Sequence, residues 1–343
     1  MDDKERFYAT VARQSVDRPA SWLGLPDPKA VPNLLKYFGA KDINEVRTII
    51  DDDLYPVSLP YHSPVSDAIE MAFDFAHKGK SDPEHRTLNS PGFFENVTDP
   101  ARVEDFDWPV PDDHIDPEEC REFVRNALDD RIKLGVIWSA HFQDTFAAFG
   151  MENACIQMMM APDVVHAVTE RIIDFYLRAN EIFYEATKGE LDAILIGNDF
   201  GGQTGLLVSP DMVRDFAFPG TRKLVNQAKD YGLKVIHHSC GSIYDIIPDL
   251  IDIGVDAIHP MQVRANNMEP QRLKDEFGEK VAFVGGVDAQ YNLVQEGPEV
   301  ISHEVQQLKA LFPTGLVISP SHEAILPDVD PANIEAIFRA VRE

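Results

Sequence analysis

The second half of the chain alternates short apolar runs with segments that carry helix start and stop signals. The strand-like runs are Leu191–Gly197, Leu233–His238, Val255–His259, Val281–Val284 and Leu316–Ser319. The segments between and after these runs predict helices. The first helix ends at Gly232, and the others are Ile243–Ile253, Pro270–Phe277, Pro298–Leu311 and a last helix from the Asp330 cap to Arg342. Strands that alternate with helices predict right-handed βαβ units and a parallel sheet.

The helix that follows Leu191–Gly197 shows how these signals are recognised. Ser209 is a typical N-cap residue, and Pro210 occupies the first helical position, where proline is favoured. Pro219 predicts a break inside the helix, because proline lacks the amide hydrogen that a helix interior requires. Gly232 predicts its C-terminal end.

The first half of the chain carries the same rhythm less clearly. Ala20–Leu25 and Val136–Ala140 predict two further strands, and Pro162–Thr187 predicts a long amphipathic helix. Residues 41–118 are acidic and rich in proline, which predicts an elaboration inserted into the fold. Because no repeat and no linker divides the chain, we expect residues 1–343 to form a single (β/α)8 TIM barrel, with an open doubly wound sheet as the alternative.

The charge of the chain excludes several classes of partner. It has 58 acidic and 31 basic residues, a formal net charge of −27, which opposes binding to nucleic acid and to anionic membranes. No apolar run reaches the roughly 18–20 residues that span a bilayer. The start of the chain is charged and resembles no signal peptide, and three cysteines do not suggest a disulfide framework. We therefore expect a cytoplasmic protein; the oligomeric state stays open.

Polar residues follow the predicted strands at the points where the strands end. They are His141, Asp199, His238, Cys240, His259, Asp288, His322 and Glu323. Active sites of parallel barrels are built at the carboxyl ends of the strands. These side chains therefore predict a shared site, although caps and loop hydrogen bonds would equally explain Asp288 and His259.

His238 and Cys240 are the most informative of these residues. Residues two apart on a strand point to the same face, so the imidazole and the thiol converge. Nitrogen and sulfur donors together suit Zn²⁺. The alternative is that Cys240 fills space as a small apolar residue. His237 points to the opposite face and is expected to pack towards the helices.

Several motifs occur in an order that resembles the uroporphyrinogen decarboxylase superfamily. They are Gly197–Gln203, Ser209–Pro210, His238–Gly241, Gly254–Ile258, Gly285–Asp288 and, near the start, Val11–Pro19. The resemblance implies a (β/α)8 barrel. It also implies one of two activities: cofactor-free decarboxylation of uroporphyrinogen, or zinc-dependent methyl transfer with corrinoid proteins.

The first predicted strand favours the second activity. Decarboxylases of the superfamily carry arginines there that hold the substrate carboxylates, whereas this chain has Pro19–Asp27 without an arginine. A substrate with eight carboxylates requires guanidinium partners, and an acidic protein without them repels it. The sequence therefore resembles the methyltransferase branch more closely.

Methyltransferases of the superfamily bind zinc through His-x-Cys and a distant third ligand, which is usually a cysteine. His238 and Cys240 match the pair, and His322, 82 residues after Cys240, stands near the third position, with Glu323 as an alternative ligand. Two imidazoles, one thiolate and one open position form a sound catalytic zinc site. Asp199 and Gln203 are expected to orient the substrate.

The sequence thus predicts a zinc-dependent methyltransferase that moves a methyl group between a small substrate and a corrinoid carried by a partner protein. Two alternatives stay open. One is a decarboxylase of uroporphyrinogen or of a smaller acid, with Asp199 as the acid–base group. The other is a non-catalytic protein that binds a small molecule or a corrinoid.

Overall fold

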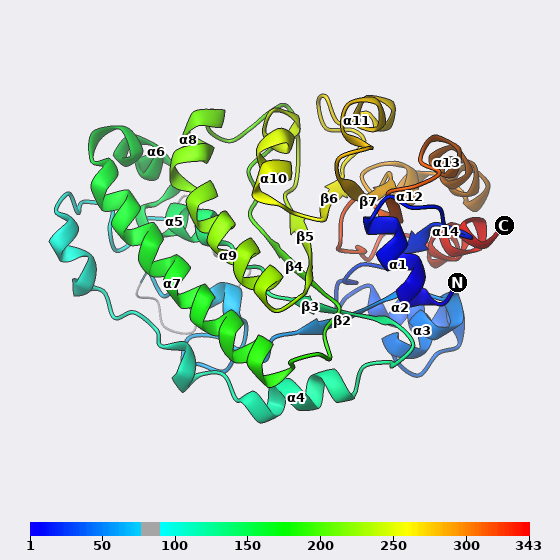
Figure 1. The fold of residues 1–343 in the computed structure, drawn as a ribbon, viewed down its shortest axis with the longest axis horizontal. Coiled ribbons are helices and arrows are strands. Elements are labelled where there is room, and N and C mark those ends of the chain that lie inside the picture. Colours follow the sequence, from blue (N-terminus) through cyan, green and yellow to red (C-terminus); the bar gives the residue numbers. More distant parts are fainter. Residues whose placement is uncertain (77–89) are drawn as a thin grey trace.

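Eight parallel strands form the centre of the fold (Figure 1). The computed structural model describes residues 1–76 and 90–343, so part of the predicted elaboration at 41–118 lies outside the described residues. The strands are β1 (Ala20–Ser21), β2 (Leu54–Ser58), β3 (Ile132–Val136), β4 (Ala193–Gly197), β5 (Lys234–His238), β6 (Ala257–Met261), β7 (Ala282–Val287) and β8 (Leu316–Pro320).

The strand order identifies the architecture. Each strand from β2 to β8 lies beside its neighbour in sequence, and β1 pairs with β8. A doubly wound sheet would reverse its order at a switch point, and this sheet does not. The predicted (β/α)8 barrel is therefore confirmed, and the open sheet is not adopted.

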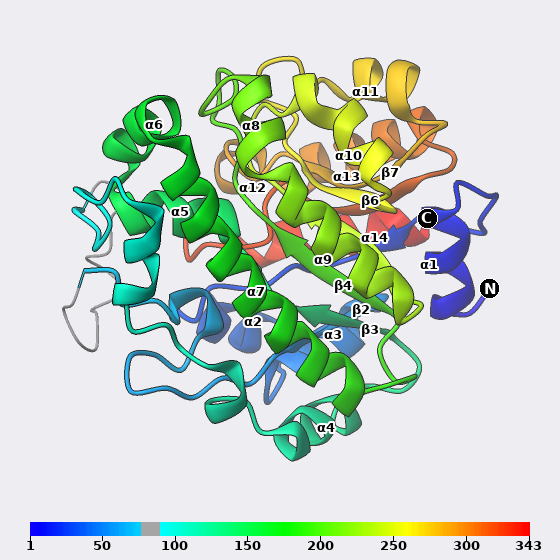
Figure 2. The same ribbon diagram turned by 60° about the vertical axis from the view of Figure 1, so that its left-hand side comes forward.

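Helices surround the strands (Figure 2). The α-helices are α1 (Asp3–Val11), α2 (Val31–Phe38), α3 (Ile43–Ile50), α4 (Pro117–Arg125), α5 (His141–Phe149), α6 (Met151–Met160), α7 (Pro162–Ala186), α8 (Pro210–Phe216), α9 (Phe218–Asp230), α10 (Ile247–Ile253), α11 (Pro270–Phe277), α12 (Asn292–Gln295), α13 (Pro298–Leu311) and α14 (Pro331–Arg342). Short 3₁₀ helices are η1 (Ile69–Met71), η3 (Pro100–Asp105), η4 (Pro111–Asp113) and η5 (Tyr244–Ile246).

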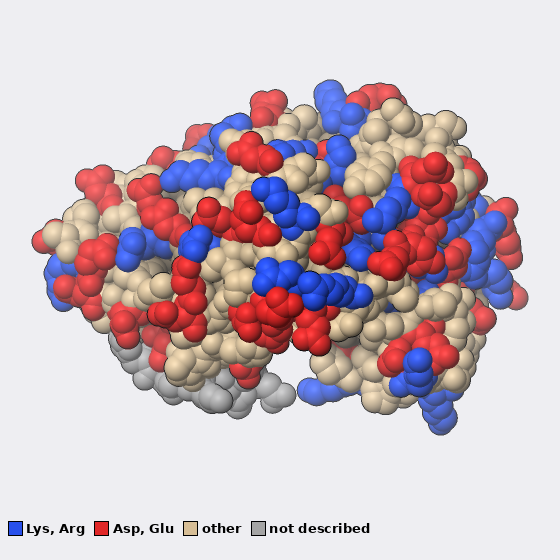
Figure 3. Space-filling model, turned by 60° about the horizontal axis from the view of Figure 1, so that its bottom comes forward, with Lys and Arg blue, Asp and Glu red and all other residues tan. Residues whose placement is uncertain are grey.

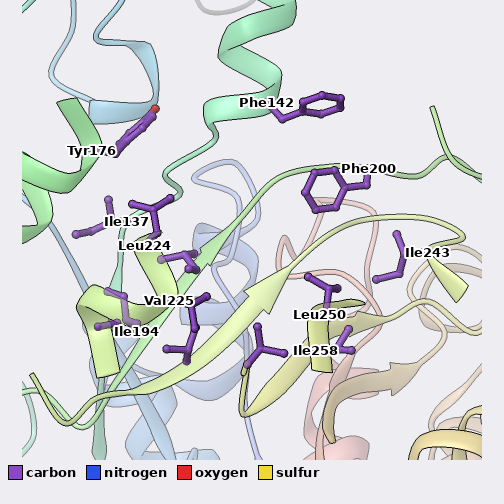
Figure 4. Packing of buried hydrophobic residues seen from close by; sticks show 14 of the residues in the cluster. Ile137, Phe142, Tyr176, Ile194, Phe200, Leu224, Val225, Ile243, Leu250 and Ile258 are labelled. Carbon is purple, nitrogen blue, oxygen red and sulfur yellow. The ribbon is translucent and has the colours of Figure 1, made fainter. Parts of the chain in front are cut away.

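Two separate apolar layers pack against the barrel. Alternate strand residues such as Leu134, Leu195 and Val317 fill its interior, and Phe7 and Val11 of α1 join them. The residues between them on the strands point outward and pack under the helices, as Ile194 and Ile258 do beside Leu224 and Leu250 in Figure 4. The period of two along each strand explains this division.

The helix predictions agree closely with the structure. Pro270–Phe277 and Pro298–Leu311 have the predicted bounds, and the last helix ends at Arg342. The predicted break near Pro219 separates α8 from α9, and the Ser209 side chain accepts the Met212 amide as a cap. Proline at the first helical position therefore marked these starts reliably.

Two strands in the first half were not predicted correctly. The prediction of a strand at Val136–Ala140 was wrong: β3 is Ile132–Val136, and the residues after it belong to the loop before α5. Lys133 obscured the strand, although its stem is buried and its ammonium reaches Asp129 at 3.0 Å. Strand β2 was missed because Pro56 interrupts it; β2 ends the hydrogen-bonded ladder, where proline is tolerated.

The predicted elaboration at 41–118 contains barrel elements as well as additional structure. Helix α3, strand β2 and the start of α4 all lie within this range. The part between β2 and α4 carries η1, η3, η4 and a cluster of aromatic rings, including Phe73, Phe94 and Trp108. This part covers one side of the barrel, and Glu70 of η1 reaches the pocket described below.

The exterior carries many acidic side chains. Red patches of Asp and Glu are interspersed with fewer blue ones on the face shown in Figure 3, in keeping with the net charge of −27. No helix in residues 1–76 or 90–343 combines the length and apolar character needed to cross a membrane.

Asp53 joins β1 to β2, where the barrel closes. Its amide donates to the Ser21 carbonyl at 3.1 Å, and its Oδ2 accepts the Ser21 amide at 2.7 Å. Arg6 and Arg18 each donate to the Asp53 carboxylate at 2.7 Å. The fully buried carboxylate is thus neutralised by two guanidinium groups, and it holds the seam through side-chain and backbone bonds together.

We expect Asp53→Ala to lower the free energy of unfolding by roughly 3 kcal/mol, the lower end of the range for breaking a buried ion pair. The lower end applies because Arg6 and Arg18 would still pair with other carboxylates. Urea denaturation at pH 7 measures the change. Asp129→Ala is the control, since Asp129 is exposed and pairs with Lys133 at the surface; we expect a change within about 0.5 kcal/mol. Equal effects of the two substitutions would contradict the role of Asp53.

Candidate metal centre

The inward-facing residues of three neighbouring strands, β4, β5 and β6, lead to one site. The series that fills the barrel on β5 continues from Ile236 to His238 and then to Cys240, and on β4 from Leu195 through Gly197 to Asp199. Parallel pairing places Gly197 beside His238 and His238 beside His259 of β6. Because parallel strands end at the same edge, their polar residues meet at the mouth of the barrel.

Glycines allow this close approach. A Cβ atom at Gly197 would lie 2.2 Å from the His238 carbonyl oxygen. Gly241 has φ +81°, and a Cβ there would lie 2.5 Å from the carbonyl carbon of Gly201. The glycines after Asp199 and after Cys240 thus let the two loops pack backbone against backbone.

Asp199, His238 and Cys240 form a compact set of donors. His238 Nε2 lies 3.2 Å from Asp199 Oδ1 and 3.4 Å from Cys240 Sγ. Asp199 Oδ1 also accepts the Cys240 amide at 2.9 Å. One ligand atom from each of the three residues lies within 4.8 Å of the other two. The predicted His-x-Cys pair therefore converges, and Asp199 joins it.

Electrostatics fix the charge of two of these groups. Burial raises the pKa of Asp199, but the hydrogen bond and positive charge of His238 outweigh it and lower the pKa to about 2. Burial lowers the pKa of His238, yet Asp199, Cys240 and Glu323 raise it well above its ordinary value. Without a metal, the site therefore holds an aspartate and an imidazolium.

A pocket of about 290 Å³ opens beside these donors. Its lining consists of Glu70, Trp138, Ala140, Gln143, Asp144, Gly197, Asp199, His238 and Glu323. Four of these described residues are acids and none is Lys or Arg. Trp138 continues the inward series of β3, and its ring lies edge-on to His238 with centroids 5.0 Å apart.

His322 and Glu323 reach the site from the loop after β8. Cys240 lies close enough to His322 to raise the pKa of its imidazole. His322 Nδ1 accepts the Ala324 amide at 3.0 Å. Glu323 Oε2 lies 3.7 Å from His238 Nδ1, and Glu323 forms a second group of possible donors with His238 and His259. The loop thus supplies two candidates for a third ligand.

Other residues named from the sequence lie elsewhere. Gln203 is exposed and does not line the pocket. The side chain of Asp288 accepts the amides of residues 290–292 and caps a turn. His141 is buried, with Nδ1 3.1 Å from the Ser139 carbonyl oxygen and Nε2 3.0 Å from that of Ala217. His237 stacks on Phe200 beneath the helices, as expected, and burial lowers its pKa to about 3.

Sequence reasoning missed Glu70, Trp138, Gln143 and Asp144 as pocket residues. Trp138 had a usable signal: it continues the inward series of Leu134 and Val136, but the wrong bounds of β3 concealed it. Gln143 and Asp144 belong to the first turn of α5, and Glu70 belongs to a 3₁₀ turn. Apolar periodicity does not mark such turns.

Comparison with known proteins identifies the family of the chain. The profile of the family described as "Uroporphyrinogen decarboxylase (URO-D)" matches residues 83–343, more than half of the chain. The chain belongs to the uroporphyrinogen decarboxylase family. The predicted family resemblance is thereby confirmed.

Curated relatives and one solved structure are more distant. Uroporphyrinogen decarboxylases of Chlorobaculum parvum and Chlorobaculum tepidum are 26% and 25% identical over 235 and 233 residues. Each match covers 64% of this chain and 62% of the relative, less than two thirds of its length. A methyltransferase from Methanosarcina mazei has a TM-score of 0.70 at 18% identity, covering 99% of this chain and 98% of the other. At that identity the likeness supports the fold.

The three cysteines are expected to differ in reactivity. Burial raises the pKa of Cys120 to about 12 and also raises that of Cys155, which slows their reaction with thiol reagents. Cys240 is partly exposed beside the pocket, and its Sγ lies 3.4 Å from His238 Nε2. In metal-free protein at pH 7 we expect iodoacetamide to modify Cys240 first, as peptide mass spectrometry would show.

Cys240→Ser is expected to remove the fast phase of this reaction, and Cys155→Ser to preserve it. If the fast phase persisted in Cys240→Ser, the assignment of the reactive thiol would be wrong.

Proposed function

We propose that this protein is a zinc-dependent methyltransferase that moves a methyl group between a small thiol or alcohol and a corrinoid held by a partner protein. The observation that carries the proposal is the set of Asp199, His238 and Cys240 beside a pocket at the barrel mouth. Family membership supports the scaffold, and the Methanosarcina mazei protein with a similar fold is a methyltransferase.

The donors fit zinc in both chemistry and spacing. Zinc–ligand distances of 2.0–2.3 Å in a tetrahedron separate neighbouring ligand atoms by roughly 3.3–3.8 Å. The two separations at His238 Nε2 are 3.2 and 3.4 Å. One thiolate, one imidazole and one carboxylate or second imidazole are all ligands that zinc accepts. The pair of His238 and Cys240 is common to both candidate donor sets, the one with Asp199 and the one with His322.

Two side chains compete for the third position. The sequence predicts His322, whereas the present conformation groups Asp199 with the pair. His322 Nδ1 accepts a hydrogen bond from the Ala324 amide, so a neutral ring carries its proton on Nε2. For Nε2 to bind a metal, that proton would have to move to Nδ1, and the hydrogen bond from Ala324 would be lost. We therefore propose Asp199 as the third donor in this conformation and His322 as the ligand if the loop rearranges.

The remaining pocket residues would act on the substrate. Zinc would act as a Lewis acid that lowers the pKa of a thiol or alcohol and makes it nucleophilic near neutral pH. Trp138 supplies an apolar wall. Gln143 Oε1 is buried without a partner among the described residues, so it can accept a hydrogen bond from a bound molecule. Gln203, named from the sequence, would contribute only if its loop closed over the pocket.

The names of the Chlorobaculum relatives suggest the alternative, decarboxylation of uroporphyrinogen. Carboxylates repel carboxylates, and the described lining of the pocket holds four acids without a Lys or Arg. Trp22 lies in the segment where the resemblance places arginines in decarboxylases, and its side chain is buried inside the barrel. The charge of the pocket therefore favours methyl transfer over decarboxylation of a polycarboxylate.

We expect protein purified without chelator to contain one zinc per chain by elemental analysis. Cys240→Ser and His238→Ala are expected to abolish stoichiometric zinc, because each removes one of the two shared ligands. Cys155→Ser, a matched cysteine substitution outside the site, is expected to retain it. Asp199→Asn and His322→Ala distinguish the third ligand, since the one that weakens zinc binding more identifies it. Absence of zinc from reconstituted wild-type protein would refute the metal proposal.

Activity is tested with free methylcobalamin and 2-mercaptoethanol under anaerobic conditions. We expect zinc-loaded protein to accelerate loss of methylcobalamin with formation of the methyl thioether, measured by absorbance and mass spectrometry, and Cys240→Ser to be inactive. Turnover of uroporphyrinogen by metal-free protein would instead support a decarboxylase. Zinc binding without either reaction would favour a non-catalytic binder.

A further inference from the structure

His259 lies directly behind the proposed zinc ligand His238. It belongs to β6 and is in register with His238 of β5, so both side chains enter the barrel from neighbouring strands. Its side chain is completely buried. The two Nδ1 atoms lie 2.9 Å apart, within hydrogen-bond distance. His259 is not a member of the donor group formed by Asp199, His238 and Cys240.

Two facing Nδ1 atoms share a single hydrogen bond, so one donates and the other accepts. If His238 is to bind a metal through Nε2, its proton must be on Nδ1, and His259 Nδ1 must accept it. The opposite direction would place the proton of His238 on Nε2 and block the metal. Glu323, 3.7 Å from His238 Nδ1, also favours a proton at that nitrogen.

The surroundings of His259 favour the accepting state. The ring is completely buried, and its Nδ1 faces His238 Nδ1 at 2.9 Å. Its Nε2 has no hydrogen-bond partner among the described residues. Trp22 packs edge-on against the ring, with centroids 5.2 Å apart, and limits its rotation. The imidazole therefore contributes a polar contact through Nδ1 alone.

We propose that His259 is a positioning residue, which accepts the Nδ1 proton of His238 and thereby holds Nε2 of His238 towards the metal. The proposal rests on the zinc-dependent function inferred above. His259 would act through His238, and it would touch neither metal nor substrate. Partners of this kind fix the tautomer and orientation of a ligating histidine, and their loss typically weakens metal binding about 10–100-fold.

Three variants test this role by zinc affinity, measured in competition with a chelating dye. His259→Phe keeps a buried ring but removes the acceptor, and we expect about 10–100-fold weaker binding. His259→Asn places an amide oxygen near the former Nδ1 and is expected to restore most of the affinity. His237→Phe, a buried histidine on the opposite face of β5, is the control and should leave zinc affinity unchanged.

Metal stoichiometry separates positioning from ligation. With Co²⁺ as a spectroscopic probe, we expect one ion per chain in both wild type and His259→Asn, with the same absorption bands. Wild-type affinity in His259→Phe would overturn the proposal. So would a second ion per chain that His259→Phe eliminates, because His259 would then be a ligand in the group with His238 and Glu323.

A measurement on metal-free wild-type protein keeps the proposal falsifiable if a variant does not fold or no zinc binds. Long-range ¹H–¹⁵N correlation spectra report which imidazole nitrogen carries the proton. We expect His259 to be neutral with its proton on Nε2 and with Nδ1 unprotonated. A proton on His259 Nδ1 would overturn the proposal. Absence of zinc from wild type with the expected tautomer would refute the proposed function alone.

Discussion

The alternation of side chains along parallel strands in register is the constraint on which both the core and the site depend. On β4, β5 and β6 the residues that fill the barrel and the residues that form the donor set belong to the same inward series. Apolar members of the series occupy the middle of the barrel, and polar members follow where the strands end. One geometric rule therefore places His238, Cys240 and Asp199 together and directs His237 under the helices.

The seam between β1 and β2 completes the ring that this arrangement requires. Strand β1 is short, so backbone pairing contributes little there, and Asp53 adds side-chain bonds to Ser21. A buried carboxylate needs compensating charge, which Arg6 and Arg18 supply. The closure of the barrel between β1 and β2, at the end opposite to the site, thus depends on ionic groups. The stability of the barrel interior depends on apolar packing instead.

Much of the fold was predictable, because apolar runs and proline-marked helix starts are local signals. Pro56 and Lys133 concealed two strands, since a proline at the edge of the ladder and a lysine with a buried stem are tolerated only in a tertiary context. For the site, the spacing of His238 and Cys240 showed that they converge. The contact of His259 with His238 depends on the register of two strands, and Glu70 enters from a distant turn; neither follows from spacing along the chain.

In the proposed zinc centre, a histidine in place of the second cysteine that the methyltransferase resemblance implies would alter the charge that bound Zn²⁺ retains. With two thiolates the ligands cancel the metal charge, whereas Cys240 with His238 and His322 would leave a net charge of +1. Asp199 as third ligand would restore neutrality. A more positive centre lowers the pKa of a bound thiol or alcohol further, but it also needs compensation, and Glu323 lies near His238 to provide it. The choice between Asp199 and His322 as third ligand would therefore also determine how strongly a bound zinc ion activates a substrate.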